Sequence, residues 1–586
     1  MNAGNNPSSG QTIVCANGLD NTGVSGANAT GVTVQTASPS GGISTTGQPG
    51  VLLGDGATVT SGSAMGSAFP ISTAGDAAAG VDVQTDATIT VDGRVSTTGA
   101  NSPAITTGDG ATVQVNGGTV RTGGGMSNAI EVGANSTITT SGNALVTTGN
   151  SNSDAIVLMG ADSTATIGTD TTVSTSSGMS NPVQIDGANG TVNVSGRVQS
   201  SSGDATAILG IADGLIVNVR DGGFVTAQSS GSNGIEAQGA NAQITVEEGG
   251  EVRISSGNSA AIVAGVDGTV TIAGTISASS SQSQGVVLGD GATLTVQQRG
   301  VIETSSSESQ AVLIDESAST ATVNINRGGN IDAVGAQAIV DRGTTDSTVT
   351  IDGTVFGGSS DPVLDMMGGN DVVIVNGTVS ATSADPVISL GAGDDQLDNN
   401  SSQTISGPGV LVDGGTGSDT LNLANGTSNN TSNYSGFETT NVGSNTNPDD
   451  PANGMSSTLT VDSNQSGNTI NANDGGTVDV SDGRTAGSVI INSNTGGSVN
   501  VSADNAAGSG TGQNGAQVNS LSGSTVNVSG GSSNPGQQTA NVTGATFGAG
   551  TTVGTGRAFQ TGTAAGSVIT LNSDFANGAG STRDAS

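Results

Sequence analysis

Short hydrophobic segments recur at a nearly constant interval through most of this chain. A small residue or proline, usually followed by Ile or Val, recurs about every 25 residues. A fixed period of this length is typical of a solenoid, in which each unit gains a core only when its neighbours stack on it. The hydrophobic residues that mark the copies are Ile105, Ile130, Ile156, Val183, Ile208, Ile235, Ile262, Val286, Val312, Ile339, Val363, Val387 and Leu411.

Each copy predicts three short strands. From Pro103, PAITTGDGATVQVNGGTVRTGGG holds an apolar pair, a Gly-Asp-Gly turn and alternating segments at 112–115 and 119–122. The copy that begins at Gln284 repeats this order, with alternating segments at 293–296 and 301–304. No segment shows the helical period of about 3.6 residues.

Alternation with a period of two residues separates an inward from an outward face. It places Thr112 and Gln114 outward, and it places these residues in the core: Val113, Val115, Val192, Val194, Val270 and Ile272. The sequence therefore predicts an all-β fold, a right-handed parallel β-helix solenoid with about 25 residues and three short strands per coil. The handedness follows from the preference for right-handed crossovers.

The pattern changes along the chain and predicts several segments. GSNTNPDDPANGMSS carries proline and aspartate without alternation, and beyond it STLTV, GTVDV and GSVII recur as thinner coils. The expected segments are N-terminal capping coils at 1–50, a main β-helix at 51–443, a loop or linker at 444–456, thinner coils at 457–571 and a frayed tail at 572–586.

Composition alone is compatible with disorder, because hydrophobic residues are 32%, glycines number 97 and the formal net charge is −37. The regular return of Ile and Val argues for a folded solenoid instead, since a low-complexity chain does not keep one phase through so many copies.

Charge and residue types exclude several partners. All 11 basic residues are Arg, and Lys, His and Trp are absent, so a phosphate backbone meets neither basic patches nor stacking aromatics. Nucleic-acid binding is therefore excluded. Membrane insertion by this chain is excluded as well, because no apolar run is long enough to span a bilayer. The single Cys15 is interpreted as a small apolar residue of a capping coil rather than as half of an intermolecular disulfide.

The first residues, MNAGNNPSSGQTIVCANG, lack the basic and apolar segments of a signal peptide. Either the protein is cytosolic or an export signal has been removed ahead of Met1. A long, Lys-free array rich in Thr, Ser and Asn is an exported composition, which favours the second.

Two segments resemble a known family. GQTIVCANGLDNTGVSGANATGVTVQT, near the N-terminus, resembles the start of many Gram-negative autotransporter (type V secretion) passengers. LVDGGTGSDTLNLANGTSNNTSNYSGFETTNV, at 411–442, is similar to the family's Asp-Gly-Gly-x-Gly-x-Asp-x-Leu segment followed by Gly-Phe-Glu. The resemblance implies a parallel β-helix passenger at the cell surface or outside the cell. Nothing after Gly443 resembles the family's C-terminal outer-membrane barrel, so that translocator is expected in the full-length protein.

The one constellation that resembles a binding site is acidic. Asp371, Asp395 and Asp419 are equally spaced, one repeat apart, within MMGGNDVV, LGAGDDQL and GGTGSDTL. In successive coils their carboxylates would stack in a column, where like charges repel unless a cation or backbone donors intervene. The last motif matches the calcium-binding nonapeptide, but that motif binds calcium by recurring without interruption along the chain, not once per coil. Structural turns are therefore favoured, and a calcium site at these three residues is the alternative; no other cofactor is expected.

The aspartates of the repeated GDGAT segments, Asp55, Asp109 and Asp290, are interpreted as turn residues. Aspartate caps its own turn and the following glycine supplies a positive φ.

Enzymatic activity is not expected. Polysaccharide-cleaving β-helix enzymes place paired carboxylates on one face, whereas Asp394 and Asp395 are neighbours on a strand and point to opposite faces. A Ser-His-Asp triad is excluded because the chain has no His.

Three functions remain. The leading hypothesis is a non-enzymatic surface rod for adhesion or cell–cell aggregation, whose polar faces bind a like rod or a host glycan or protein. A passive stalk is the second. Ice binding by outward Thr rows is the third, and the irregular outward residues Thr112, Gln114, Asn193, Glu247 and Gln297 argue against it.

Overall fold

Alternating Val, Ile and Thr residues form parallel strands in every described coil of the computed structural model. The chain divides into two compact units, unit 1 (Met1–Thr322 and Gly328–Ala338) and unit 2 (Val323–Arg327 and Ile339–Ser586). The structure describes residues 7–15, 19–36, 42–62, 70–201, 203–306, 308–344, 346–400, 405–424, 426–444, 454–463, 465, 467–480, 489–503, 517–520, 525–530, 545–547, 552–554, 561–563 and 568–570.

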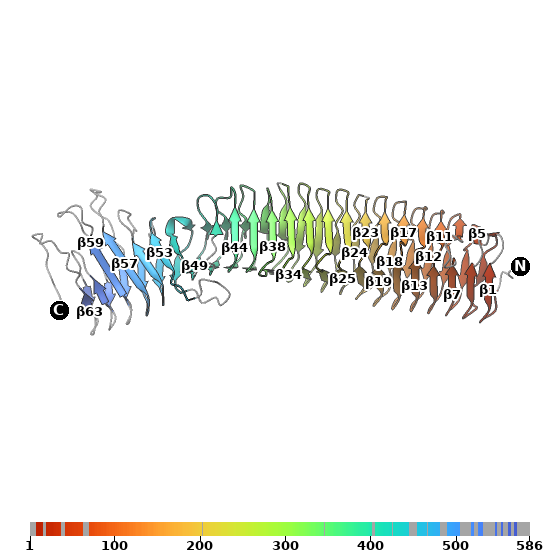
Figure 1. Cartoon of the computed structure of the whole chain (residues 1–586), viewed down its shortest axis with the longest axis horizontal. Coiled ribbons are helices and arrows are strands. Elements are labelled where there is room, and N and C mark those ends of the chain that lie inside the picture. Colours follow the sequence, from red (N-terminus) through yellow and green to blue (C-terminus); the bar gives the residue numbers. More distant parts are fainter. Residues whose placement is uncertain are drawn as a thin grey trace, which may run out of the picture. The chain divides into compact units, whose positions relative to one another are not determined.

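Unit 1 consists of three parallel sheets, to which each coil contributes one strand in turn (Figure 1). Sheet A1 contains β1 (Thr12–Cys15), β4 (Thr33–Thr36), β7 (Thr58–Ser61), β10 (Thr88–Val91), β13 (Thr112–Asn116), β16 (Thr137–Ser141), β19 (Thr164–Ile167), β22 (Thr191–Val194), β25 (Ile216–Val219), β28 (Gln243–Val246), β31 (Thr269–Ile272) and β34 (Ala292–Val296). Sheet B1 contains β2 (Leu19–Asp20), β5 (Gly42–Thr46), β8 (Pro70–Ala74), β11 (Arg94–Thr97), β14 (Thr119–Thr122), β17 (Leu145–Thr148), β20 (Thr172–Thr175), β23 (Arg197–Ser200), β26 (Phe224–Ala227), β29 (Glu251–Ile254), β32 (Thr275–Ala278), β35 (Val301–Thr304) and β38 (Asn330–Ala333). Sheet C1 contains β3 (Val24–Gly26), β6 (Val51–Leu53), β9 (Val81–Val83), β12 (Ile105–Thr107), β15 (Ile130–Val132), β18 (Ile156–Leu158), β21 (Val183–Ile185), β24 (Ile208–Gly210), β27 (Ile235–Ala237), β30 (Ala260–Ala264), β33 (Gln284–Leu288) and β36 (Gln310–Ile314).

Unit 2 begins with the same three-strand coils. Sheet A2 contains β40 (Thr348–Ile351), β43 (Val372–Val375), β46 (Gln396–Asn399), β49 (Thr420–Leu423), β52 (Thr439–Val442), β54 (Thr469–Ala472), β56 (Ile490–Ser493), β58 (Gln517–Ser520), β60 (Ala545–Phe547) and β62 (Thr561–Thr563). Sheet B2 contains β41 (Thr354–Gly357), β44 (Thr378–Ala381) and β47 (Ile405–Ser406). Sheet C2 contains β42 (Leu364–Asp365), β45 (Ile388–Ser389), β48 (Val412–Asp413) and β51 (Tyr434–Ser435). Sheet D2 contains β50 (Ser428–Asn430), β53 (Thr458–Val461), β55 (Thr477–Val480), β57 (Ser498–Ala503), β59 (Thr525–Gly530), β61 (Thr552–Gly554) and β63 (Val568–Thr570). Two strands, β37 (Ala321–Ile325) and β39 (Gln337–Asp341), have residues in both units, and the only described helix is the 3₁₀ turn η1 (Thr431–Asn433).

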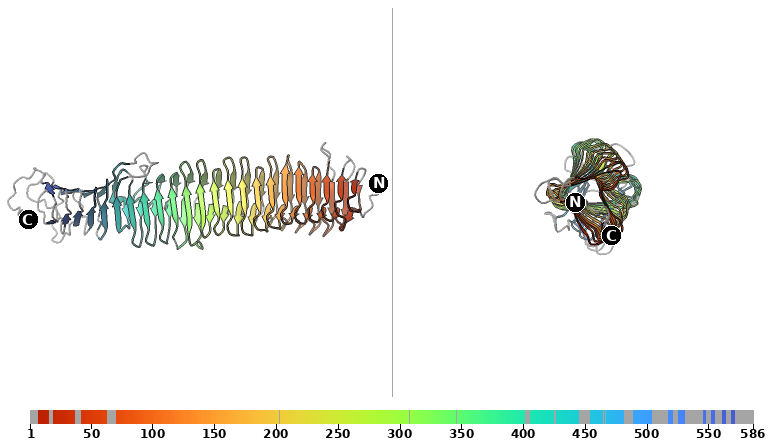
Figure 2. Two further views of the ribbon diagram at one scale, coloured as in Figure 1. Left: turned by 90° about the horizontal axis from the view of Figure 1, so that it is seen from below. Right: turned by 90° about the vertical axis from the view of Figure 1, so that its right-hand side faces the viewer.

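The predicted fold class, an all-β right-handed parallel β-helix solenoid with three short strands per coil, is confirmed. Neighbouring coils pair in register, as with Val113 and Ile138 in sheet A1 and Ile105 and Ile130 in sheet C1 (Figure 2). Because the register keeps inward residues above one another, each coil covers the core of the next. The six residues predicted to point inward are all fully buried: Val113, Val115, Val192, Val194, Val270 and Ile272.

Where the inward residues are Ser or Thr instead of apolar residues, their buried hydroxyls link successive coils by hydrogen bonds. Between sheets B1 and C1, the Ser102 N–H donates to Ser127 Oγ at 2.9 Å, and the Ser127 N–H donates to Ser153 Oγ at 3.0 Å. The Thr122 hydroxyl closes the same turn by donating to the Ser127 carbonyl at 2.7 Å. These bonds satisfy polar groups that would otherwise be costly to bury.

The coils of unit 2 lose one strand after β51. Equivalent residues of successive A2 strands, from Thr348 through Val372 and Gln396 to Thr420, pair at one constant interval. Thr469 pairs with Ile490 across a shorter stretch of chain. In these later coils, described strands belong only to sheets A2 and D2. The expected loop at 444–456 lies largely outside the described residues, as does the tail at 572–586, so the segment bounds stay a prediction.

Among the described residues, no helix has the length and hydrophobicity needed to cross a membrane.

Candidate functional site

The three aspartates singled out by their spacing lie in one column in unit 2. Asp371, Asp395 and Asp419 each precede a strand of sheet A2, namely β43, β46 and β49. Their exposed fractions are 0%, 2% and 1%, so the column faces the interior of the coils.

One oxygen of each carboxylate accepts a backbone hydrogen bond from the preceding coil. The Ser347 N–H donates to Asp371 Oδ1 at 2.8 Å and the Asp371 N–H to Asp395 Oδ1 at 2.7 Å. The Asp395 N–H donates to Asp419 Oδ1 at 2.9 Å, and Glu438 Oε2 accepts from the Asp419 N–H at 2.7 Å. The sequence predicted that either a cation or backbone donors would offset the repulsion between these carboxylates. The structure shows the backbone donors.

The second oxygen of each carboxylate is buried without a hydrogen-bond partner. This holds for Oδ2 of Asp371, Asp395 and Asp419, and also of Asp341. Burial raises the pKa of Asp371 to about 8, opposed by the Ser347 N–H and reinforced by the negative charges of Asp341 and Asp395. Burial therefore favours the protonated form of Asp371, and Oδ2 is the oxygen free to carry the proton.

The next two carboxyls are shifted in the same direction. Burial raises the pKa of Asp395 and of Asp419 to about 6, against the stabilising N–H bonds. The nearby charges of Asp394 and Glu438 add to this shift. The column can thus take up and release protons between mildly acidic and mildly basic pH.

Glycines in the motifs are explained by the close stacking of the coils. Gly415 and Gly417 have φ angles of 98° and 150°. A Cβ at Gly417 would overlap the carbonyl oxygen of Gly393, and a Cβ at Gly415 that of Gly391. Glycine is thus required here by the backbone, whether or not an ion binds.

The neighbouring carboxylates Asp394 and Asp395 point away from each other. Asp394 is exposed and its Oδ1 accepts from the Ser418 N–H at 2.9 Å, one coil further on, whereas Asp395 reaches back into the preceding coil. The two side chains are thus opposed as expected, but both residues lie in the turn before β46 and not on a strand, as the prediction had assumed. Absence of enzymatic activity stays a prediction.

Calcium binding also stays a prediction. In the part of the chain that the structure describes, no three or more Asp, Glu, His or Cys residues are gathered closely enough to hold a metal ion. Sequence reasoning missed Glu438, which ends the column, and Asp341, whose charge lies near Asp371 at the other end. Asp341 lies further from Asp371 than one repeat, and Glu438 lies closer to Asp419 than one repeat, so neither follows the regular spacing. Only the Gly-Phe-Glu segment gave a signal for Glu438.

The GDGAT aspartates do lie in turns, and the following glycines Gly110 and Gly291 have φ angles of 70° and 68°. The Asp109 carboxylate, however, accepts from the Ala134 N–H at 2.7 Å, and Asp290 from the Ser319 N–H at 2.8 Å. These carboxylates therefore cap the turn of the next coil, a role that the prediction of self-capping did not include.

A second candidate site is the outward face of sheet A1. None of the residues in its twelve described strands is charged. Six of those strands present two outward Thr residues each, at Thr58 and Thr60, Thr88 and Thr90, Thr137 and Thr139, Thr164 and Thr166, Thr269 and Thr271, and Thr293 and Thr295.

The other two sheets of unit 1 do carry charge. Strands of sheet B1 contain Asp20, Arg94, Arg121, Arg197, Glu251, Arg253, Glu303 and Asp332. Strands of sheet C1 contain Asp82, Glu131 and Glu236. In a chain of net charge −37, sheet A1 is distinct because its described strands contain no charged residue. One charge does reach this face, because Arg220, which follows β25, donates from its guanidinium to Asn193 Oδ1 at 2.9 Å.

The fold defines the chain as a parallel β-solenoid protein. No protein-family model matches it, and no curated protein matches it significantly.

Proposed function

We propose that this chain is a non-enzymatic passenger, exposed at the cell surface or released from it, that acts in adhesion or cell–cell aggregation. The observation that carries the proposal is the absence of charged residues from the described strands of sheet A1. Depletion of charged residues is the compositional mark of the centre of a protein interface. A face of Thr, Asn and Gln supplies methyl groups for contact and hydroxyls and amides for hydrogen bonds.

The partner that fits this face best is a second copy of the chain. Two molecules of net charge −37 repel each other wherever their acidic surfaces meet. Contact through two A1 faces opposes no like charges. A host glycan or protein with a neutral polar surface is the other partner that could contact this face without repulsion between like charges.

Export is supported by the residues at 411–442 that resemble autotransporter passengers and by the Lys-free, Thr- and Ser-rich composition. An outer-membrane translocator belongs to this proposal as the partner of the full-length protein.

The test is the settling of bacteria that display the chain. Thr139 pairs with Thr166 in sheet A1, and Thr147 pairs with Ser174 in sheet B1, and all four side chains are outward. We expect Thr139→Asp with Thr166→Asp to slow settling and the matched Thr147→Asp with Ser174→Asp to leave it unchanged.

Raising ionic strength from about 0.01 M to about 0.15 M shortens the screening length from roughly 30 to roughly 8 Å and should speed settling. Equal settling of both variants and the parent would favour a passive stalk.

Ice binding is a second candidate function. The sequence argued against it because irregular outward residues interrupt the Thr rows, and the structure shows that two of those residues are not on the sheet. Glu247 and Gln297 follow β28 and β34 and lie in exposed turns rather than on the face of sheet A1. Gln114 and Asn193 still interrupt the Thr columns. Thermal hysteresis of the purified chain tests this function, and its loss in Thr139→Asp with Thr166→Asp would assign it to the same face.

A further inference from the structure

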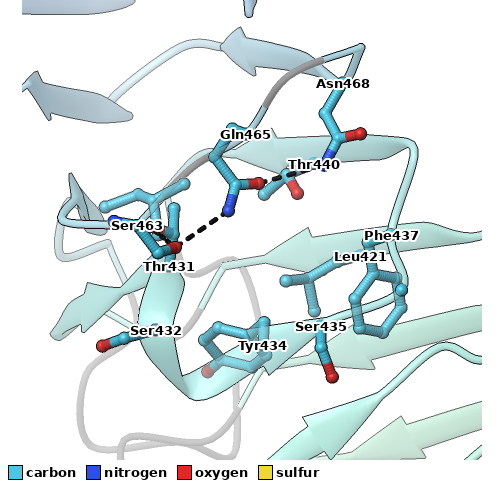
Figure 3. A pocket seen from close by; sticks show the side chains of 12 residues that line it. Leu421, Thr431, Ser432, Tyr434, Ser435, Phe437, Thr440, Ser463, Gln465 and Asn468 are labelled. Carbon is cyan, nitrogen blue, oxygen red and sulfur yellow. Dashed lines mark hydrogen bonds between the residues drawn. The ribbon is translucent and has the colours of Figure 1, made fainter. Parts of the chain in front are cut away.

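A pocket of about 320 Å³ opens in unit 2 where sheet C2 ends. The last strand of that sheet is β51, and Ser463, Gln465 and Asn468, from the chain between β53 and β54, line the pocket together with Tyr434 (Figure 3). The missing strand leaves interior side chains of the neighbouring coils lining a space instead of a strand.

The floor of the pocket is apolar and contains two aromatic rings. Leu421, Leu459, Tyr434 and Phe437 all line it and are buried. The Tyr434 hydroxyl donates to Asn429 Oδ1 at 3.1 Å, so the polar end of the ring is held within the coil. An apolar floor with aromatic rings suits the C–H face of a sugar ring, which is apolar although its edge is polar.

The rim carries hydroxyls and amides that hold one another in place. Ser463 Oγ lies 2.7 Å from the Thr431 hydroxyl, Gln465 Nε2 donates to Ser463 Oγ at 3.0 Å, and Asn468 Nδ2 donates to Gln465 Oε1 at 3.1 Å (Figure 3). Each amide has two N–H donors and an oxygen with two lone pairs, so these bonds leave capacity for a ligand. A rim ordered by its own hydrogen bonds loses less entropy when a ligand binds.

The charge around the pocket selects against anions. None of the residues that line it is charged. Glu438 follows Phe437 directly, and Asp462 accepts from the Ser432 N–H at 2.8 Å, so the flanking charges are negative. A carboxylated or phosphorylated ligand would meet like charge without a compensating base.

We propose that this pocket binds one uncharged sugar residue, with its apolar face toward Tyr434 and Phe437 and its hydroxyls on the rim formed by Ser463, Gln465 and Asn468. The volume is at the lower end of that of ligand pockets, which fits a single residue rather than a longer chain. This site is separate from the face of sheet A1 and does not depend on the function proposed for that face.

The chain supplies its own probe for the test. Tyr434 is its only tyrosine and tryptophan is absent, so tyrosine emission reports on this pocket. Neutral methyl glycosides of glucose, galactose and N-acetylglucosamine would be titrated into the whole chain, with N-acetylneuraminic acid as the anionic comparison. We expect a saturable change in emission with at least one neutral glycoside, at a dissociation constant on the order of 1 mM.

Two variants separate specific binding from a general effect. Gln465→Ala should weaken binding about five-fold through loss of a hydrogen-bonding group, and Gln243→Ala, on sheet A1, should leave it unchanged. The proposal is overturned if no neutral glycoside gives a saturable change, if Gln465→Ala binds like the parent, or if the anionic sugar binds as tightly. Binding that persists in Thr139→Asp with Thr166→Asp would uphold the pocket even where aggregation fails.

Discussion

The backbone N–H of Asp371 donates a 2.7 Å hydrogen bond to Oδ1 of Asp395, while Oδ2 of Asp395 is buried without a hydrogen-bond partner. The side chain of one coil thus caps the backbone of the coil before it and leaves its second oxygen in the interior. An ionised carboxylate is costly there, whereas a protonated one is not. The column therefore links the stability of unit 2 to pH.

We predict that unit 2 melts at a higher temperature at about pH 5 than at about pH 9. Burial raises the pKa of Asp371 to about 8 and those of Asp395 and Asp419 to about 6. A carboxyl whose pKa is higher in the folded than in the unfolded chain stabilises the fold below about pH 4, its unfolded value. That contribution is lost as the pH rises through 6 and then 8.

Circular dichroism melts across this pH range provide the measurement. Asp371→Asn keeps an oxygen that can accept from the Ser347 N–H but cannot ionise, so it should flatten the pH dependence. The matched change Asp394→Asn, at an exposed carboxylate, should not. The same slope in all three proteins would contradict a role for the buried column.

Calcium provides a second test of the same residues. We predict that millimolar calcium raises the melting temperature modestly at about pH 8, where Asp395 and Asp419 are ionised, and has no effect at about pH 5. The effect should disappear in Asp395→Ala with Asp419→Ala. Calorimetry that detects no calcium binding at either pH would leave backbone amides and protons as the only groups that neutralise the column.

Val194→Asp should destabilise unit 1 by several kcal/mol, because it buries an unpaired charge. Val194 is fully buried in β22, where its predecessor Asn193 points outward. Asn193→Asp is therefore the matched control, and we expect it to change the free energy of unfolding by less than about 0.5 kcal/mol. The free energy of unfolding is measured by urea denaturation. If both variants lost a similar amount, the assignment of one inward and one outward side to this strand would be wrong.

Met179→Gly should stabilise unit 1 by about 1 kcal/mol. Met179 has a φ of 53° in a turn and is 59% exposed, so its side chain adds backbone strain with little packing in return. Met159 is also exposed, at 43%, but its φ is not positive. Met159→Gly should accordingly bring no gain, and a rise in the melting temperature for both variants would refute strain as the cause.

Much of the coil was predictable because its information is local. Alternation around Val113 and Val115 is contained in a few residues, and a strand that buries one face must point those residues inward whatever its partner is. The recurrence of Ile105, Ile130 and Ile156 in turn predicts that equivalent strands stack, since no single coil has a core. The spacing of Asp371, Asp395 and Asp419 likewise placed them in one column.

The contacts that form when coils stack could not be predicted from the sequence. The tertiary structure directs Oδ1 of Asp395 to the preceding coil and the carboxylate of Asp109 to the next one. It also adds Glu438 to the end of the column and brings the charge of Asp341 near Asp371, both from positions outside the regular repeat. The outward face of sheet A1 gathers residues from successive repeats, and the pocket beside Tyr434 lies where sheet C2 ends while sheets A2 and D2 continue. The sequence by itself determined the strands, their inward residues and the solenoid, because these follow from local alternation and a repeated period. Only the tertiary structure decided hydrogen-bond partners, protonation and the surfaces available for binding, because these depend on which coil lies above and below each side chain.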